Sequence, residues 1–455
     1  MPACGAVFDS VSQACSVIPR RGEAIGSTYD ATGELTSLIF PDTGTRQMSY
    51  DSRGNVTSFT DSDGDLYTIR FTSPGTCNVV LNDPDGDGKG SIDQLILSGT
   101  TAKSAVAITV LKAVTGDGFV PIGDVTGTGS LSSFRALQSD LTINGFSFTG
   151  PVASVGVRDI LEPDAILAHP TIHTGGAAAN LLTVTARHIG NDFTLDTTST
   201  LSGLTAADIG TGTITAPAIS RLTASTGGIG ADITTAGALT ALAAHGTVSG
   251  HLTASHFGTI TVTGGDVSGQ IDATATALAL GRTAALSGLS VIGGNFTGDV
   301  RAHGQLGTFS ITASKTGVGG NFTGGTVNAG GISKFTVAKN MMDDIVLAGA
   351  DLGADHALGG AGANADTFGA GSLGSVIVGG NVTASVFGAG LNPFDAIFHN
   401  GNDTILGGIL SNIATLVVAG TASNDSYFAA HTFTRTPTIH GVAVNPATDP
   451  RFLKA

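Results

Sequence analysis

The sequence is short of several residue types. It has no tryptophan, four tyrosines and three cysteines among 455 residues, and charged residues make up 12% of the chain. The lysines and arginines number 20 against 35 acidic residues, which gives a formal net charge of −15. Because contacts with phosphate groups need clustered lysine and arginine, this balance argues against a nucleic-acid or anionic-membrane partner.

Glutamate is scarce as well. Only Glu23, Glu34 and Glu162 occur, so nearly all the acidic residues are aspartates. Glutamate favours helices, whereas aspartate favours turns and metal-binding loops. Together with 67 glycines and frequent β-branched residues, this composition predicts an all-β protein with many tight turns.

The cysteines are too few for a disulfide scaffold. In an oxidising compartment Cys4 and Cys15 could close a short loop and leave Cys77 single. The alternative is that all three are reduced and buried. The sequence leaves both alternatives open.

No apolar run reaches the roughly 18 residues of a membrane-spanning helix, so we expect no membrane span. Residues 1–23 contain Asp9, Arg20 and Arg21 and lack the apolar stretch of a signal peptide. We therefore expect either an exported protein whose signal was removed or one segment of a longer polypeptide.

After an N-terminal segment, residues 1–24, the region 25–72 carries two copies of one phrase. Tyr29–Thr36 (YDATGELT) is followed 21 residues later by Tyr50–Thr57 (YDSRGNVT). Aspartate opens a tight turn and glycine accepts positive φ, so each copy predicts a β-hairpin.

These phrases resemble the YD (RHS-type) repeat, from the tyrosine–aspartate start to the Gly-Asn-Val exit of the second copy. The resemblance covers about 50 residues. It implies β-structure and a place at the cell surface or outside the cell. Two copies are too few to build the shells that longer arrays of this family form.

A second repeat occupies residues 73–160. Asp85–Ile92 (DGDGKGSI) aligns with Asp124–Leu131 (DVTGTGSL), which starts 39 residues later. Alternating segments such as Ala105–Leu111 lie between the copies. This period predicts two or three strands in each unit.

Residues 161–432 carry a looser phrase, Gly-Gly-Asn/Asp-Val/Phe-Ser/Thr. Successive copies, two of them degenerate, are 19 to 41 residues apart and start at His245, Gly264, Gly293, Gly319, Ala338 and Gly379. This spacing predicts a right-handed parallel β-helix, or β-solenoid, in which the longest gap holds two coils. We expect the asparagine or aspartate of each phrase to stack on the next coil.

Two further segments depart from this pattern. Gly349–Gly371 is rich in alanine, glycine and aspartate and predicts a loop that leaves the coil. Residues 433–455 contain three prolines and predict a closing cap or an extended tail. The Gly-Gly-Asn-Val-Thr phrases also resemble those of very large bacterial surface proteins, which implies the same architecture and an exterior location.

The strongest candidate site is the loop that holds Asp83, Asp85 and Asp87, with Asp93 following. Carboxylates at alternate positions of a glycine-rich loop resemble the first half of an EF-hand-type or thrombospondin-type calcium loop. The twelfth position is Gln94 rather than glutamate, and no helix is predicted beside the loop. A solvated acidic turn is therefore the alternative.

Asp61, Asp63 and Asp65 repeat this alternation more weakly. They also match the ordinary turn of the YD repeat, so a turn is the favoured interpretation and a calcium site the second. At either place Ca²⁺ would be a structural cofactor.

The sequence contains no Gly-x-Ser-x-Gly, His-Glu-x-x-His or phosphate-cradling motif, so we do not expect an enzyme. Our hypothesis is an extracellular structural or adhesive β-solenoid of the cell surface or matrix. Solenoid ends expose unpaired strand edges, so self-association into a homo-oligomer or filament is expected, with surface polysaccharide as a possible partner.

The alternative is a carbohydrate-active β-helix enzyme, a polysaccharide lyase or hydrolase. Such an enzyme needs a place where at least two carboxylates and one lysine or arginine converge. The residues that could contribute are Asp266, Asp272, Asp299, Asp343, Asp344, Arg282, Arg301, Lys315, Lys334 and Lys339.

Overall fold

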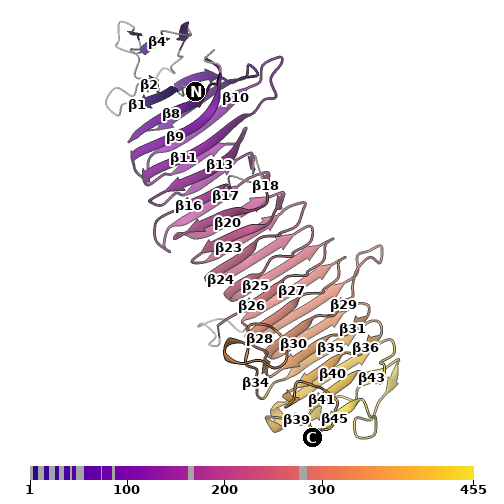
Figure 1. Ribbon diagram of the computed structural model, residues 1–455. Helices are drawn as coiled ribbons and strands as arrows, with labels where there is room; N and C mark the ends of the chain where they lie inside the picture. The colour runs from indigo at the N-terminus through magenta and orange to yellow at the C-terminus, as the bar shows by residue number, and fades with distance from the viewer. Residues whose placement is uncertain are drawn as a thin grey trace. The chain divides into compact units, whose positions relative to one another are not determined.

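The computed structural model describes residues 4–8, 15–19, 26–29, 35–40, 44–47, 56–72, 74–84, 88–161, 169–275 and 284–455, with side chains from residue 58 onward. The chain divides into two compact units, Met1–Ala218 and Ile219–Ala455. Regular structure in the described ranges is β throughout, apart from two short 3₁₀ turns, η1 (Gly362–Asn364) and η2 (Gly408–Leu410). The prediction of an all-β protein is confirmed (Figure 1).

The first unit begins with antiparallel strands. β3 pairs with β4, and β4 with β5, across the first tyrosine–aspartate phrase. A second antiparallel set runs in the order β2–β1–β8–β9, and a third in the order β6–β7–β10. The strands are β1 (Cys4–Phe8), β2 (Cys15–Pro19), β3 (Gly26–Tyr29), β4 (Leu35–Phe40), β5 (Gly44–Gln47), β6 (Val56–Thr60), β7 (Leu66–Thr72), β8 (Thr76–Asn82), β9 (Ser91–Thr100) and β10 (Ala105–Leu111).

From β9 and β10 onward the pairing becomes parallel, and each strand pairs with one that comes two or three places later in the chain. One ladder runs β9–β11–β13–β16–β19–β22 and another β10–β12–β14–β17–β20. A third, shorter ladder runs β13–β15–β18–β21. The parallel pairing thus starts upstream of residue 161, where the repeat phrases change.

The strands of these three ladders are β11 (Val120–Gly129), β12 (Ser133–Ala136), β13 (Ser139–Phe148), β14 (Ser154–Val157), β15 (Asp159–Ile160), β16 (Thr171–Thr174), β17 (Leu181–Thr185), β18 (His188–Ile189), β19 (Phe193–Thr197), β20 (Thr200–Ala206), β21 (Asp208–Ile209) and β22 (Gly212–Ala216). Buried and exposed residues alternate along most of them, as in β17. Apolar side chains therefore face the interior while threonine and serine face solvent.

The second unit has three parallel ladders of its own. They run β23–β24–β25–β27–β28–β30–β35–β40–β43, then β24–β25–β26–β28–β30–β32–β37–β41–β45, and β29–β31–β36. Because β28 and β30 are long, each belongs to two ladders and carries the chain from one to the other (Figure 1).

The strands of these ladders are β23 (Ile219–Ala224), β24 (Asp232–Ala244), β25 (Leu252–Thr263), β26 (Gln270–Ala273), β27 (Leu286–Ile292), β28 (Asp299–Thr312), β29 (Phe322–Thr323), β30 (Thr326–Val337), β31 (Met341–Met342), β32 (Ile345–Ala348), β35 (Leu373–Val378), β36 (Val382–Thr383), β37 (Val386–Ala389), β40 (Asn412–Val418), β41 (Tyr427–Ala430), β43 (Thr438–Ile439) and β45 (Phe452–Lys454). β42 (Thr432–Phe433) also pairs with β40, and β44 (Val442–Ala443) folds back on β43.

The repeat phrase of the second unit forms the expected asparagine ladder. The side-chain Oδ1 of Asn295 accepts the main-chain N–H of Asn321, 26 residues later, at 3.2 Å. Equivalent bonds join Asp266 to Asn295, Asn321 to Asn340, Asn340 to Asn381 and Asn381 to Thr421. The prediction that the longest gap holds two coils is wrong, because Asn340 bonds directly to Asn381 and β31 pairs directly with β36. Behind this ladder a column of phenylalanines fills the core, in contacts such as the stacked rings of Phe309 and Phe335, whose centroids are 4.8 Å apart.

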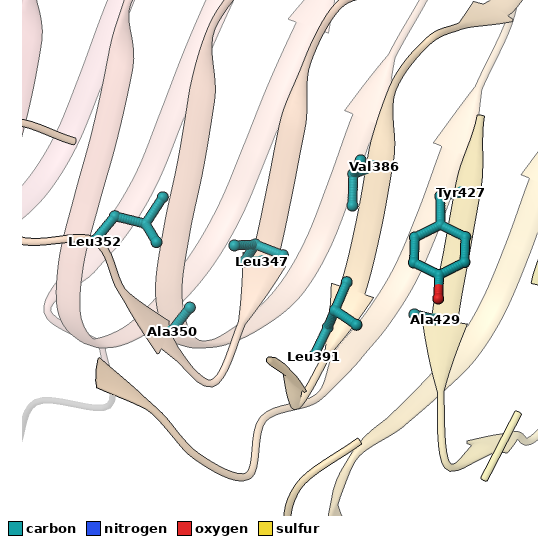
Figure 2. Packing of buried hydrophobic residues seen from close by; sticks show 7 residues of the cluster. All are labelled: Leu347, Ala350, Leu352, Val386, Leu391, Tyr427 and Ala429. Carbon is teal, nitrogen blue, oxygen red and sulfur yellow. The ribbon is translucent and has the colours of Figure 1, made fainter. Parts of the chain in front are cut away.

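Two antiparallel hairpins leave the ladder that contains β32 and β37. The first joins β33 (Ala350–Asp351) to β34 (Thr367–Phe368), and the second joins β38 (Leu391–Asn392) to β39 (Thr404–Ile405). An apolar cluster, shown in Figure 2, anchors both, and its buried members are Leu347, Ala350, Leu352, Val386, Leu391, Tyr427 and Ala429. Among the described residues no helix has the length and apolar character needed to cross a membrane.

Candidate functional site

Three aspartates meet in the turn between β6 and β7. Within the described ranges, Asp61, Asp63 and Asp65 are the one group of acidic, histidine or cysteine residues with ligand atoms close enough to hold a metal ion, all within 4.8 Å of one another. Oδ1 of Asp61 accepts the main-chain N–H groups of Asp63, Gly64 and Asp65 at 3.2, 3.1 and 2.9 Å. The turn is therefore hydrogen-bonded by its own backbone.

This turn is also fastened to a loop far along the chain. The two carboxylate oxygens of Asp65 accept the main-chain N–H groups of Ala113 and Gly118. A side chain at Gly116 would place its Cβ 1.7 Å from Oδ1 of Asp65, so only glycine fits there. Asp65 is fully buried and its charge is spread over these main-chain donors, which makes it a structural contact.

The other two carboxyl groups of the turn affect each other. Burial raises the pKa of Asp61 to about 6, and its hydrogen bond with the side chain of Asp63 adds to this rise. The same hydrogen bond lowers the pKa of Asp63, which also accepts the N–H of Asp117 at 2.8 Å. As the pH falls toward 6, Asp61 and Asp63 share a proton, and a cation that binds here has to displace this proton.

The first predicted calcium loop is only partly described. Asp83 is buried at the end of β8, and its Oδ2 accepts the N–H of Gly88 at 3.0 Å. Asp85 and Asp87 lie outside the described residues. Asp93 lies on β9, and the described residues do not bring it into a metal-binding group with Asp83.

The described residues that flank the first predicted loop contact the acidic turn. The N–H of Gly90, which ends the first loop, donates to the carbonyl of Thr60 at 3.0 Å. The Tyr67 hydroxyl donates to the carbonyl of Gly90 at 2.8 Å. Since Thr60 directly precedes Asp61, these bonds hold Gly90 beside the start of the acidic turn.

A different group of ionisable residues gathers in the second unit. Asp272 on β26 is paired in register with Arg301 on β28. His303 lies two residues beyond Arg301 on the same outward face, because Val300 and Ala302 point into the core. Asp351 ends β33 in the first hairpin, and His356 follows in its loop. We refer to Asp272, Arg301, His303, Asp351 and His356 as the mixed cluster.

Arg301 joins the two carboxylates of the mixed cluster. Its Nε lies 2.6 Å from Oδ1 of Asp351, and its Nη1 lies 3.7 Å from Oδ1 of Asp272. His303 Nε2 is 3.5 Å from Oδ2 of Asp351, and His356 Nε2 is 3.4 Å from Oδ2 of Asp272. The first hairpin is thereby tied to the strands β26 and β28 by charge as well as by apolar packing.

Electrostatics keeps Asp351 ionised. Its partial burial raises the pKa, but the hydrogen bond from Arg301 and the charges of His303 and Arg301 outweigh this, so the pKa lies below its usual range.

The mixed cluster contains polar atoms that lack a hydrogen-bond partner in the described part of the chain. They are Oδ1 of Asp272, Nε2 of His303 and both ring nitrogens of His356. The His356 residue is only 3% exposed, and its φ of 57° is unusual for a residue with a side chain. Unsatisfied buried polar atoms and backbone strain are both enriched at functional sites.

Sequence reasoning found only part of this cluster. It named Asp272 as one of five aspartates and Arg301 as one of five basic residues that could contribute to a catalytic site, without a reason to pair them. It placed Asp351 and His356 in a loop and did not consider His303. The missing signal was register, because nothing in the sequence says that β26 lies beside β28 or that the first hairpin folds back over them.

Comparison with known proteins gives one match. The family model described as RHS Repeat matches residues 29–66, which include the two tyrosine–aspartate phrases and the acidic turn at Asp61–Asp65. This confirms the YD-repeat part of the resemblance. No curated protein and no solved structure matches the chain significantly.

Proposed function

We propose that the chain is a structural β-solenoid of the cell surface or extracellular matrix, in which the parallel ladders wind as a right-handed β-helix. The observation that carries the proposal is the asparagine ladder, which repeats once per turn of the second unit. Stacked turns of this kind bury a continuous core in a narrow, extended body, which suits a spacer or fibre subunit.

The RHS repeat match supports an exterior location, because such repeats are typical of cell-surface and extracellular proteins. The low content of charged residues and the threonine-rich outer faces suit contact with other surface polymers, so polysaccharide is the expected partner. Fractionation of cells tests the location. Recovery of the protein only from the cytosol would contradict the proposal.

Self-association belongs to the same proposal. Among the described residues β45 pairs with β41 on one side, and a strand edge that is left unpaired favours pairing with another chain. We expect electron microscopy of purified protein near neutral pH to show filaments whose length grows with concentration. Uniform short particles with the mass of one chain at every concentration would contradict the proposed self-association.

We further propose a structural calcium ion at the acidic loops, held by Asp61, Asp63 and Asp65 or by the loop that contains Asp83 and Asp85. An ion that binds only the folded chain raises the Tm as its concentration rises. We expect millimolar calcium to raise the Tm relative to chelator in the wild type.

The control variants for this experiment separate the two loops. Asp61→Ala with Asp63→Ala removes the first set of ligands, and Asp85→Ala with Asp87→Ala removes the second. The pair that abolishes the calcium effect identifies the site. Equal Tm values with calcium and with chelator in the wild type would contradict the proposed calcium ion.

The mixed cluster favours a second candidate function, a carbohydrate-active lyase or hydrolase. Two carboxylates, Asp272 and Asp351, converge on Arg301, as such chemistry requires. We expect purified protein to cleave polysaccharides and Asp272→Asn to lose that activity. Absence of new reducing or unsaturated ends on both neutral and uronate-containing polysaccharides would remove this candidate.

A further inference from the structure

The two hairpins of the second unit enclose a hollow. They leave the ladder at equivalent places, because Ala348 and Ala389 are register partners and each is followed by a glycine at positive φ, Gly349 at 83° and Gly390 at 68°. The space between their loops has a volume of about 420 Å³. This lies within the range of roughly 300–1,000 Å³ that is usual for small-molecule sites.

The wall of this hollow combines aromatic and acidic groups. Phe368, Pro393 and Phe394 supply apolar surface, and Asp366 and Asp395 supply carboxylates; the remaining lining residues are small or carry an amide. No lysine or arginine lines it. An anionic ligand would therefore meet only like charge.

Phe394 is held in an unusual position. Its side chain is 68% exposed, and its φ of 55° is a strained value for a bulky residue. Ala396 and His399 in the same loop also have positive φ, 64° and 63°. A loop that keeps an aromatic ring in solvent at a cost in backbone strain is typical of a binding surface.

Hydrogen bonds fix this loop, so that the ring is presented in one place. Oδ2 of Asp395 accepts the side-chain amides of Asn400 and Asn402 at 2.8 and 2.7 Å. Oδ2 of Asp403 accepts the N–H of His399 at 2.7 Å, and the His399 ring stacks on Tyr427 with centroids 4.5 Å apart. The carboxylate of Asp395 is thus already occupied.

Asp366 on the opposite loop is different. Its Oδ2 accepts the N–H of Gly359 at 2.6 Å, but its Oδ1 has no hydrogen-bond partner among the described residues. Burial raises the pKa of Asp366, and the nearby charges of Asp355 and Asp351 add to this. Oδ1 is itself buried, so the wall of the hollow contains one covered acceptor oxygen that lacks a donor, beside an exposed aromatic face.

We propose that this hollow binds a neutral sugar unit of a polysaccharide, with the apolar face of the sugar on Phe394 and a hydroxyl donating to Asp366. A pyranose ring has an apolar C–H face and several hydroxyl donors, which match an aromatic ring and an unpartnered carboxylate oxygen. The inference rests on the proposed polysaccharide partner and names its chemical class and its site.

The test uses the purified full chain on an array of neutral, amino and uronate glycans. We expect retention of neutral glycans and weak or no retention of uronates, because Asp366 and Asp395 repel them. Binding to the best neutral oligosaccharide should become about tenfold weaker in Phe394→Ala, the loss expected for one stacked ring. Asp366→Asn should weaken it as well.

Ile397→Ala is the matched control. Ile397 is 58% exposed in the same loop but does not line the hollow, so its loss should leave affinity unchanged. Selective retention of uronates or amines, absence of neutral-glycan binding, or equal affinity in wild type and Phe394→Ala would overturn the inference. Because binding is measured on purified protein, a negative result here does not contradict the proposed surface location or filament formation, which fractionation and electron microscopy test separately.

Discussion

The acidic turn of the first unit and the mixed cluster of the second use the same residue type in opposite ways. Asp61, Asp63 and Asp65 accept main-chain N–H groups, and in the described part of the chain no ion pair joins them to a basic side chain. Asp272 and Asp351 instead face Arg301 and two histidines. Only the second arrangement leaves buried polar atoms without partners in the described structure.

The difference follows from how each site is assembled. Residues two apart in a turn can share the turn's own donors, so their carboxylates are satisfied locally. The mixed cluster unites residues that are distant in the chain, such as Arg301 and Asp351, which are 50 residues apart. Its charges must satisfy one another, and the removal of any one leaves the rest unbalanced.

The largest effect should come from Arg301→Ala. It leaves Asp272 and Asp351 partly buried without their shared cation, and we expect the second unit to lose about 3 kcal/mol of unfolding free energy. Denaturant unfolding followed by circular dichroism measures this. Arg221→Ala, at an exposed position on β23, is the control and should change the unfolding free energy little. Similar losses in both variants would contradict the central role of Arg301.

Asp344 differs from the aspartates of both the acidic turn and the mixed cluster. Asp344 is fully buried and has no basic partner in the described contacts, and burial raises its pKa to about 7. Because the folded state then holds a proton that the unfolded state has released, stability should fall as the pH rises from about 4 to about 7. Between pH 5 and pH 8 we expect a loss on the order of 2 kcal/mol.

Asp344→Asn should flatten this dependence, since the amide does not titrate. The N–H groups of Gly325 and Met342 bond to different oxygens of the carboxylate, at 3.2 and 2.9 Å. The amide therefore keeps one of these two bonds and loses the other. Unfolding by urea at several pH values measures the slope. An unchanged slope in the variant would assign the dependence to another group.

A smaller effect should follow from Gly116→Ala. The added Cβ would collide with Oδ1 of Asp65, so the loop must shift away from the acidic turn, at a cost of about 1.5 kcal/mol. Gly203→Ala is the control, because its Cβ would meet only the Thr183 methyl group at 3.8 Å. Equal stability of the two variants would show that the loop adjusts without strain.

Raised salt should change the unfolding free energy least. It should weaken the stabilising attraction in the mixed cluster and the destabilising repulsion in the acidic turn. Raised ionic strength screens the attraction in the mixed cluster and the repulsion among the turn's aspartates, each by a few tenths of a kcal/mol. The loss of unfolding free energy caused by Arg301→Ala should therefore be smaller at high salt. A gain in unfolding free energy from Asp63→Asn should be smaller there as well. Salt-independent differences would mean that hydrogen-bond geometry outweighs charge at both sites.

The sequence predicted the local features of this protein better than the distant ones. The asparagines of the repeat phrase stack as expected, including Asn340 in a degenerate copy, because each phrase contains its own turn and its own amide. The convergence of Asp61 with Asp63 and Asp65 was likewise visible in their spacing. His356 could not be placed, since its position depends on the fold of the first hairpin over β26 and β28.

The asparagine ladder has a direction. Asp266 stands at its start, and its Oδ1 accepts both the N–H and the side-chain amide of Asn295. Thr421 stands at the other end and donates its N–H and its hydroxyl to Asn381. Between these ends each ladder residue donates its N–H to the residue of the preceding turn, and its side-chain oxygen accepts the N–H of the following one. One turn can therefore be removed or duplicated, and the turns on either side of it still form the same bond. The length of such a protein can change during evolution by whole turns, with no new contact to be invented.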